Sequence, residues 1–154
     1  MKTRTMLLVG SFCLFAFVAG FAADANVGTW KLNEGKSKIP AGSPKNTKVV
    51  YTAAGDKYKA MIDGVDGAGK PLHNEWTGKF DGKDYPVTGE PNYDARSILK
   101  VDDHHYKVAN KKAGKTVLTG TVEFSADGKT RTLTTESTDA AGKTTTATFV
   151  YDKG

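Results

Sequence analysis

Cysteine is almost absent from this chain of 154 residues, which contains a single one, Cys13. One thiol cannot form an intrachain disulfide, so the chain is not a small domain held together by disulfide bonds. Cys13 also lies in an N-terminal segment that, as argued below, we expect to be removed. A mature protein without cysteine has no thiol nucleophile and no cysteine ligand for a metal, and its fold must rest on the burial of apolar surface.

Sequence motifs of catalysis are missing as well. None of the serines stands in a Gly-x-Ser-x-Gly arrangement, and the chain has no His-Glu-x-x-His motif, phosphate-binding loop or dinucleotide fingerprint. Glu75 and Glu123 are far apart in the sequence and fall on polar strand faces, so they do not suggest a general acid–base pair. We therefore predict a protein that is not an enzyme and needs no cofactor. The net charge of +5 is too small to indicate binding to nucleic acid.

Histidine and aspartate clusters are present, but their spacing is wrong for a metal site. His104 and His105 are adjacent, and adjacent residues in a strand point to opposite faces of the sheet. Calcium-binding loops place their ligands at every second position. The aspartate pairs are instead spaced by three residues: Asp63 with Asp66, and Asp81 with Asp84. We assign all of these to polar turns and predict no bound metal.

The N-terminus has the pattern of a secretory signal peptide. Lys2 and Arg4 precede an uncharged apolar run, which gives way to small residues within positions 20–25. Cleavage is expected after Ala22 or after Ala25, because both have a small residue at the −3 position. The protein is then exported, to the periplasm or the extracellular space, and keeps no membrane span after processing.

The expected organisation is a signal peptide over residues 1–23, with cleavage between 22 and 25, and one domain over residues 24–154. Removing the first 23 residues leaves 131 and takes away two positive charges, so the net charge falls to +3. Leu, Ile, Val and Phe then make up only 16% of the residues, a proportion at which disorder becomes a concern. The low net charge, two tryptophans, six tyrosines and a regular polar–apolar alternation nevertheless predict a folded chain with a thin core.

Short runs of alternating polar and apolar residues fill this domain and predict an all-β fold. Tyr58, Ala60 and Ile62, for example, share one face opposite two lysines and Met61. Asp-Gly and Ala-Gly pairs separate the runs and supply the positive φ angles that tight hairpins need. We predict strands near residues 27–32, 47–54, 57–63, 71–80, 84–88, 95–101, 105–112, 115–124, 129–137 and 143–152.

The number of strands predicts how the sheet is closed. An open meander of ten strands would expose long sheet edges, and closure into a barrel removes them. We therefore predict a single antiparallel up-and-down β-barrel of 8–10 strands, with a β-sandwich as the alternative. The one long connection, residues 33–46, is either a surface excursion or a flap over an open end of the barrel.

The first strand of this domain resembles that of the calycins. Val27-Gly28-Thr29-Trp30-Lys31-Leu32 contains the Gly-x-Trp of lipocalins and is similar to the start of fatty-acid-binding proteins. Residues 148–153 resemble the last strand of a fatty-acid-binding protein. Taken whole, the chain is similar to small exported bacterial proteins with a lipocalin-like domain and no established activity, through phrases such as residues 30–33 and 81–89. The resemblance implies a lipocalin-like barrel with Trp30 buried at one end.

Two features depart from the resemblance to fatty-acid-binding proteins. Fatty-acid-binding proteins place an arginine two residues before the tyrosine of the last strand, where it holds the ligand carboxylate, and here Phe149 occupies the position. The helical pair that covers their barrel is also longer than residues 33–46. The resemblance therefore implies the barrel without its fatty-acid site.

A barrel with so thin a core is expected to enclose space for a small ligand. Alternation places six candidate ligand-binding residues inside: Tyr58, Trp76, Tyr106, Phe124, Arg131 and Tyr151. Arg131 shares its strand face with Leu133, and an inward guanidinium favours an anionic or strongly polar ligand head. Arg96 shares its face with both Ile98 and Lys100, so no second inward arginine is expected.

These observations predict an exported, non-catalytic protein that binds a small hydrophobic or amphipathic ligand and is a monomer. One alternative is a periplasmic protein-binding module or inhibitor, which would act through surface loops near residues 36–46 or 89–93. Another is an enzyme on the same barrel, since one fold can host unrelated activities.

Overall fold

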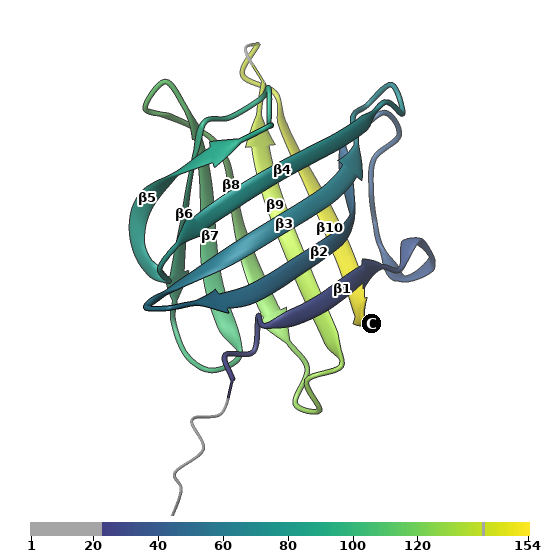
Figure 1. Ribbon diagram of the computed structural model, residues 1–154. Coiled ribbons are helices and arrows are strands. Elements are labelled where there is room, and N and C mark those ends of the chain that lie inside the picture. Colours follow the sequence, from purple (N-terminus) through teal and green to yellow (C-terminus); the bar gives the residue numbers. More distant parts are fainter. Residues whose placement is uncertain (1–22, 140) are drawn as a thin grey trace, which may run out of the picture.

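The computed structural model describes residues 23–139 and 141–154, and within them the chain forms ten β-strands and one short 3-10 helix (Figure 1). The elements are β1 (Gly28–Leu32), η1 (Glu34–Lys36), β2 (Lys45–Ala54), β3 (Lys57–Val65), β4 (Pro71–Gly78), β5 (Asp81–Thr88), β6 (Ala95–Lys100), β7 (His105–Lys112), β8 (Lys115–Phe124), β9 (Thr130–Thr138) and β10 (Thr144–Lys153). The predicted strands agree with these to within about three residues at each end. No helix in this part of the chain is long and apolar enough to cross a membrane. The predicted signal peptide, apart from Ala23, lies outside the described residues.

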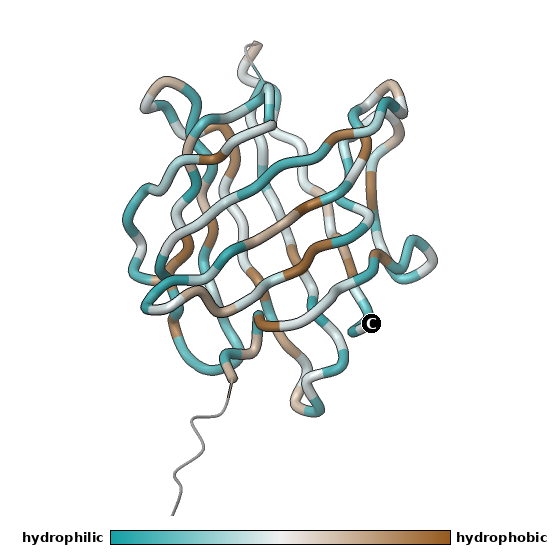
Figure 2. Tube along the Cα trace, viewed as in Figure 1, coloured by the Kyte–Doolittle hydropathy of each residue, from teal (hydrophilic) through white to brown (hydrophobic). Residues whose placement is uncertain are grey.

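Each strand pairs with the next along the chain, and β1 closes the sheet by pairing with both β2 and β10. Trp30 of β1 stands opposite Val49 on one side, and Leu32 stands opposite Tyr151 on the other. All of these ladders are antiparallel, so the predicted up-and-down barrel is confirmed and the sandwich alternative is excluded. Figure 2 shows the pattern behind this prediction: along the strands, short hydrophobic segments are separated by hydrophilic residues.

Tight turns join most of the strands, and the β7–β8 hairpin shows how the sequence produces them. Ala113 and Gly114 both have positive φ, 48° and 77°. Two successive positive φ angles are typical of the type I′ turn, whose twist matches that of the flanking strands. This is the conformation expected from the Ala-Gly pair.

An up-and-down order places alternate connections at opposite ends of the barrel. The β2–β3, β4–β5, β6–β7 and β8–β9 turns lie at one end, which we call the floor end. The β3–β4, β5–β6, β7–β8 and β9–β10 connections lie at the other end, the mouth, and residues 33–44 run along β10 to reach it.

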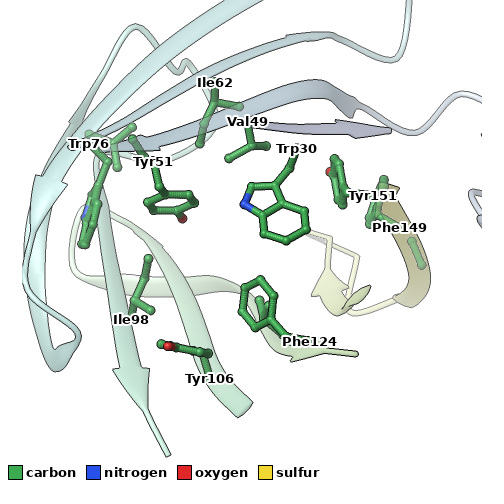
Figure 3. Close-up of a cluster of buried hydrophobic side chains, with 14 residues drawn as sticks. Trp30, Val49, Tyr51, Ile62, Trp76, Ile98, Tyr106, Phe124, Phe149 and Tyr151 are labelled. Atoms are coloured by element: carbon green, nitrogen blue, oxygen red, sulfur yellow. The ribbon is translucent and has the colours of Figure 1, made fainter. Parts of the chain in front are cut away.

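The floor end is filled by an aromatic plug, formed by Trp30, Tyr58, Trp76, Phe80, Tyr106 and Phe124. Phe80 lies at its centre, with ring centroids 4.2 Å from Tyr58, 6.2 Å from Trp76 and 5.5 Å from Tyr106. Trp30 is fully buried, as expected, and its ring faces Phe124 at 5.3 Å (Figure 3). This plug fills the barrel at one end, and the cavity described below lies in the other half.

The N-terminal segment of the described chain is fastened to the plug. The Asp24 carboxylate accepts hydrogen bonds from the Tyr106 hydroxyl at 2.9 Å and from Lys100 Nζ at 3.2 Å. The Trp30 indole N–H donates to the Asn26 carbonyl at 2.8 Å. Residues 24–26 therefore form part of the floor.

The long connection 33–44 is held against the last strand and ends at the mouth. Asn33 caps η1 by accepting from the Lys36 backbone N–H at 3.2 Å. Lys38 then exchanges two backbone hydrogen bonds with Thr148 of β10, at 2.7 and 2.8 Å. Beyond this bridge, Ser43 and Pro44 line the cavity described next. This placement favours the flap over the surface excursion.

Candidate ligand-binding cavity

The half of the barrel above the plug encloses a cavity of about 290 Å³. Its walls are mainly apolar, because the inward positions of seven strands carry aliphatic or aromatic side chains there: Val49, Tyr51, Ile62, Ile98, Val108, Leu118, Leu133, Ala147, Phe149 and Tyr151. Its rim at the mouth is polar, formed by Ser43, Asn46, Glu90, Asn92, Ser137 and Thr145. Apolar walls with a few polar groups are typical of small-molecule sites, and this volume is at the lower end of their usual range of about 300–1,000 Å³.

Arg131 lies deep in this cavity, next to the plug. It is the second residue of β9 and stands between Phe124 of β8 and Tyr151 of β10 in the sheet. Its side chain is 4% exposed and its guanidinium carbon lies 5.3 Å from the Tyr151 ring centroid. Nε and Nη1 are buried and have no hydrogen-bond partner among residues 23–139 and 141–154. The inward orientation of Arg131 is therefore as the strand alternation predicted.

Arg96 also points into the cavity, which corrects the expectation that no second arginine faces inward. It is 5% exposed, and its hydrogen bonds go to Asn110 Oδ1 at 3.0 Å from Nε and to the Tyr93 hydroxyl at 2.6 Å from Nη2. Lys100, on the same strand face, misled the sequence argument. It lies at the floor end of β6, where its ammonium reaches Asp24 at 3.2 Å and Asp103 at 3.0 Å. The face can therefore point inward along most of the strand and still end in a partly exposed charge.

The two arginines give the cavity positive charge, and neither forms an ion pair with a carboxylate of the described residues. Every ion pair found in this part of the structure has lysine or histidine as its cation. Glu90 is the carboxylate among the lining residues, and it sits at the rim, with Asn74 Nδ2 at 3.4 Å and Asn92 Nδ2 at 2.9 Å. A guanidinium does not lose its proton in proteins, so the charge is permanent.

Tyrosines add neutral hydrogen-bonding groups to the same space. Burial raises the pKa of Tyr151 to about 12, although Arg131 and, more weakly, Arg96 favour its ionised form. Burial likewise raises the pKa of Tyr93, against the opposing charge of Arg96. Both phenols are therefore protonated at physiological pH and can donate to a ligand. The cavity thus combines fixed cations, phenol donors and apolar walls.

The structure separates the six predicted ligand-binding residues into two groups. Arg131 and Tyr151 line the cavity together, whereas the other four belong to the plug: Tyr58, Trp76, Tyr106 and Phe124. The sequence argument missed several lining residues: Tyr51, Tyr93, Arg96, Asn110 and Phe149. The alternation of Tyr51 with Val49 was a signal that could have found one of them.

The predicted polar turns hold for Asp66 and His104, whereas Asp63 lies in β3, Asp81 and Asp84 lie in β5, and His105 begins β7. The Asp102 carboxylate accepts backbone N–H groups of His104 and His105 at 2.8 and 2.9 Å, and it contacts His105 Nδ1 at 2.8 Å. On the outer surface of β3 and β4, His73 Nδ1 lies 2.7 Å from Asp63. Asp63 and, to a lesser extent, Glu75 raise the pKa of His73. Over the described ranges, no three such side chains are grouped so as to hold a metal ion.

Comparison with known proteins adds a likeness in fold. No family model matches the chain, and no curated protein sequence matches it. Among solved structures, lobster apocrustacyanin A1 is similar, with a TM-score of 0.42 and 12% sequence identity. The match covers 86% of this chain and 62% of the crustacyanin chain.

Proposed function

We propose that this protein is an exported, non-catalytic binding protein that holds a small amphipathic molecule inside its barrel. The observation that carries the proposal is the cavity of about 290 Å³, which combines apolar walls with a buried Arg131 whose Nε and Nη1 have no partner among residues 23–139 and 141–154. A buried polar group without a partner is uncommon in proteins and calls for a ligand or water. The alternative of a protein-binding module needed a filled barrel, so the cavity favours a small ligand.

The groups that line the cavity support binding rather than turnover. Arginine stays protonated at ordinary pH and so cannot act as a general base, and the raised pKa of Tyr151, about 12, keeps its phenol from acting as a base near neutrality. Export is supported by the charged start, apolar run and small residues at the N-terminus.

A neutral fluorescent probe tests this function. N-phenyl-1-naphthylamine is apolar and brightens when it leaves water, so it should bind the purified domain saturably at one site. Ala147 and Thr145 both line the cavity, and a tryptophan at either position should occupy the space and abolish binding. Circular dichroism and a cooperative melt show whether each variant is folded. Failure of the wild type to bind, or full binding by both folded tryptophan variants, would overturn the proposal.

A further inference from the structure

The clearest unexplained feature of the molecule is the contrast between its two buried arginines. Arg96 has partners within the chain, since Asn110 and Tyr93 accept from Nε and Nη2. Arg131 is equally buried, yet Nε and Nη1 find no acceptor among the described residues. A guanidinium offers five N–H donors in a fixed fork that fits a carboxylate or a sulfonate. Within the described residues, Arg131 therefore has no acceptor for these two nitrogens and no carboxylate in an ion pair.

Resting on the ligand-binding function above, we propose that the cavity selects a compact organic monoanion, with a carboxylate or sulfonate head bound by Arg131. The position of Arg131 sets the orientation. It adjoins Phe124 of the plug and Tyr151, so the head lies at the bottom of the cavity. The apolar body then extends toward the mouth along Val49, Leu133 and Phe149, which line the walls.

The charge around the site favours an anion over a neutral polar head. Arg96 adds a second fixed cation to the same cavity, and both arginines influence the Tyr151 phenol. Glu90 is at the rim and is engaged by Asn74 and Asn92. Opposite charges attract strongly where water is excluded. An acidic head therefore gains an electrostatic attraction to the arginines that a neutral head lacks. The volume of about 290 Å³ restricts the body to a compact aromatic or alicyclic group.

A matched pair of probes separates the anion preference from binding itself. 1-Anilinonaphthalene-8-sulfonate carries the same aromatic body as N-phenyl-1-naphthylamine and adds only the sulfonate. Arg131→Leu should weaken the sulfonate probe ten- to a hundredfold, the range for hydrogen bonds to a charged group, and change the neutral probe less than threefold. Arg131→Lys keeps the charge but loses the fork, and should fall between. Competition by naphthalene-1-acetic acid, compared with its amide, extends the test to a carboxylate.

The control is Lys107→Leu, which removes one positive charge from the exposed outer face of β7. It should leave both probes unchanged, because exposed charges at a distance are screened by salt. The sulfonate preference should also be flat between pH 6 and 9, since no guanidinium titrates there. Equal weakening of both probes by Arg131→Leu, or no weakening of either, would overturn the anion preference alone. Absence of neutral-probe binding to the wild type would instead overturn the proposed function and this inference with it.

Discussion

Replacing Arg131 with leucine should make the ligand-free protein more stable, which is the reverse of what deleting a buried charged side chain usually does. In the folded state, Nε and Nη1 of Arg131 are buried without acceptors among the described residues. In the unfolded state, water satisfies both. Folding therefore leaves two donors unpaired, and leucine at the same position removes this penalty while remaining apolar and inward.

The magnitude follows from the two unpaired donors and the one contact that is lost. An unsatisfied buried donor costs about 1–3 kcal/mol. The guanidinium also lies 5.3 Å from the Tyr151 ring centroid, a contact of roughly 0.5–2 kcal/mol. Two such donors cost about 2–6 kcal/mol, so after the lost contact is subtracted the net gain for Arg131→Leu centres on about 3 kcal/mol, which for a domain of this size corresponds to a rise in Tm of roughly 10 °C.

Arg96→Leu is the matched control, because it removes the same residue type at nearly the same burial. Its loss leaves buried Asn110 without its donor at 3.0 Å and Tyr93 without its partner at 2.6 Å. This variant should lose about 1.5–3 kcal/mol, the range for hydrogen bonds to a charged group. The two substitutions are therefore expected to have opposite signs.

The assay is urea unfolding and thermal melting of protein that has been unfolded, freed of ligand and refolded. Removing ligand matters because a bound anion would stabilise the wild type by mass action and mask the effect. Addition of 1-anilinonaphthalene-8-sulfonate should then raise the Tm of the wild type more than that of Arg131→Leu. A lower stability of Arg131→Leu, with an unchanged urea m-value, would refute the reasoning that its guanidinium is unpaired in the folded protein.

Three further predictions concern the floor end and the phenols. Trp30→Ala should cost roughly 3–5 kcal/mol in urea unfolding, because the indole is fully buried in the plug; a cost below about 1 kcal/mol would contradict that packing. Burial raises the pKa of Tyr151 to about 12, so the folded state holds this proton more tightly than the unfolded chain. Stability should therefore fall between about pH 10 and 12, by up to about 3 kcal/mol, and Tyr151→Phe should lessen the fall; equal alkaline sensitivity in both proteins would count against it. Of the two expected cleavage sites, the one after Ala22 keeps Asp24, which is bound by Tyr106 and Lys100, so N-terminal sequencing of protein from the cell envelope should begin at Ala23; a start at Asn26, or an intact Met1, would show that this contact or export itself is misjudged.

The barrel could be predicted from the sequence because its signals are local. Alternation along a strand and glycine in a turn are decided by a few neighbouring residues, as in the Ala113-Gly114 hairpin. Closure then followed from the need to avoid exposed sheet edges. The burial of Trp30 came from the resemblance of the first strand, and the inward orientation of Arg131 from its parity with Leu133.

The height of a residue along the barrel axis could not be predicted in the same way. Parity places Phe124 and Leu118 of β8 on the same inner face, yet Phe124 belongs to the plug and Leu118 to the cavity. The difference depends on strand tilt and on which residues of distant strands share a layer. Four of the six predicted ligand-binding residues therefore lie below the cavity.

Arg96 shows a second limit of the parity argument. Its strand face also carries Lys100, and a lysine usually indicates solvent. At the end of a strand, however, a long side chain can leave the interior and place its charge at the end of the barrel. Lys100 does so at the floor end by reaching Asp24. An inward strand face can therefore end in a lysine. An arginine four residues earlier on the same face can still be buried.

The thin core and the cavity both follow from the small number of large aliphatic residues, and the aromatic plug allows the protein to fold despite it. Large aliphatic residues are scarce in the domain, but six aromatic side chains are concentrated at the floor end, where each buries a large apolar area. Closure of the sheet and the bonds of Asp24 to Tyr106 and Lys100 add stability at the same end. The mouth half can then remain hollow and hold an unpaired Arg131 without unfolding the protein. Stability and ligand selection are thus assigned to opposite ends of one barrel, and this is why a substitution in the cavity can raise the first while abolishing the second.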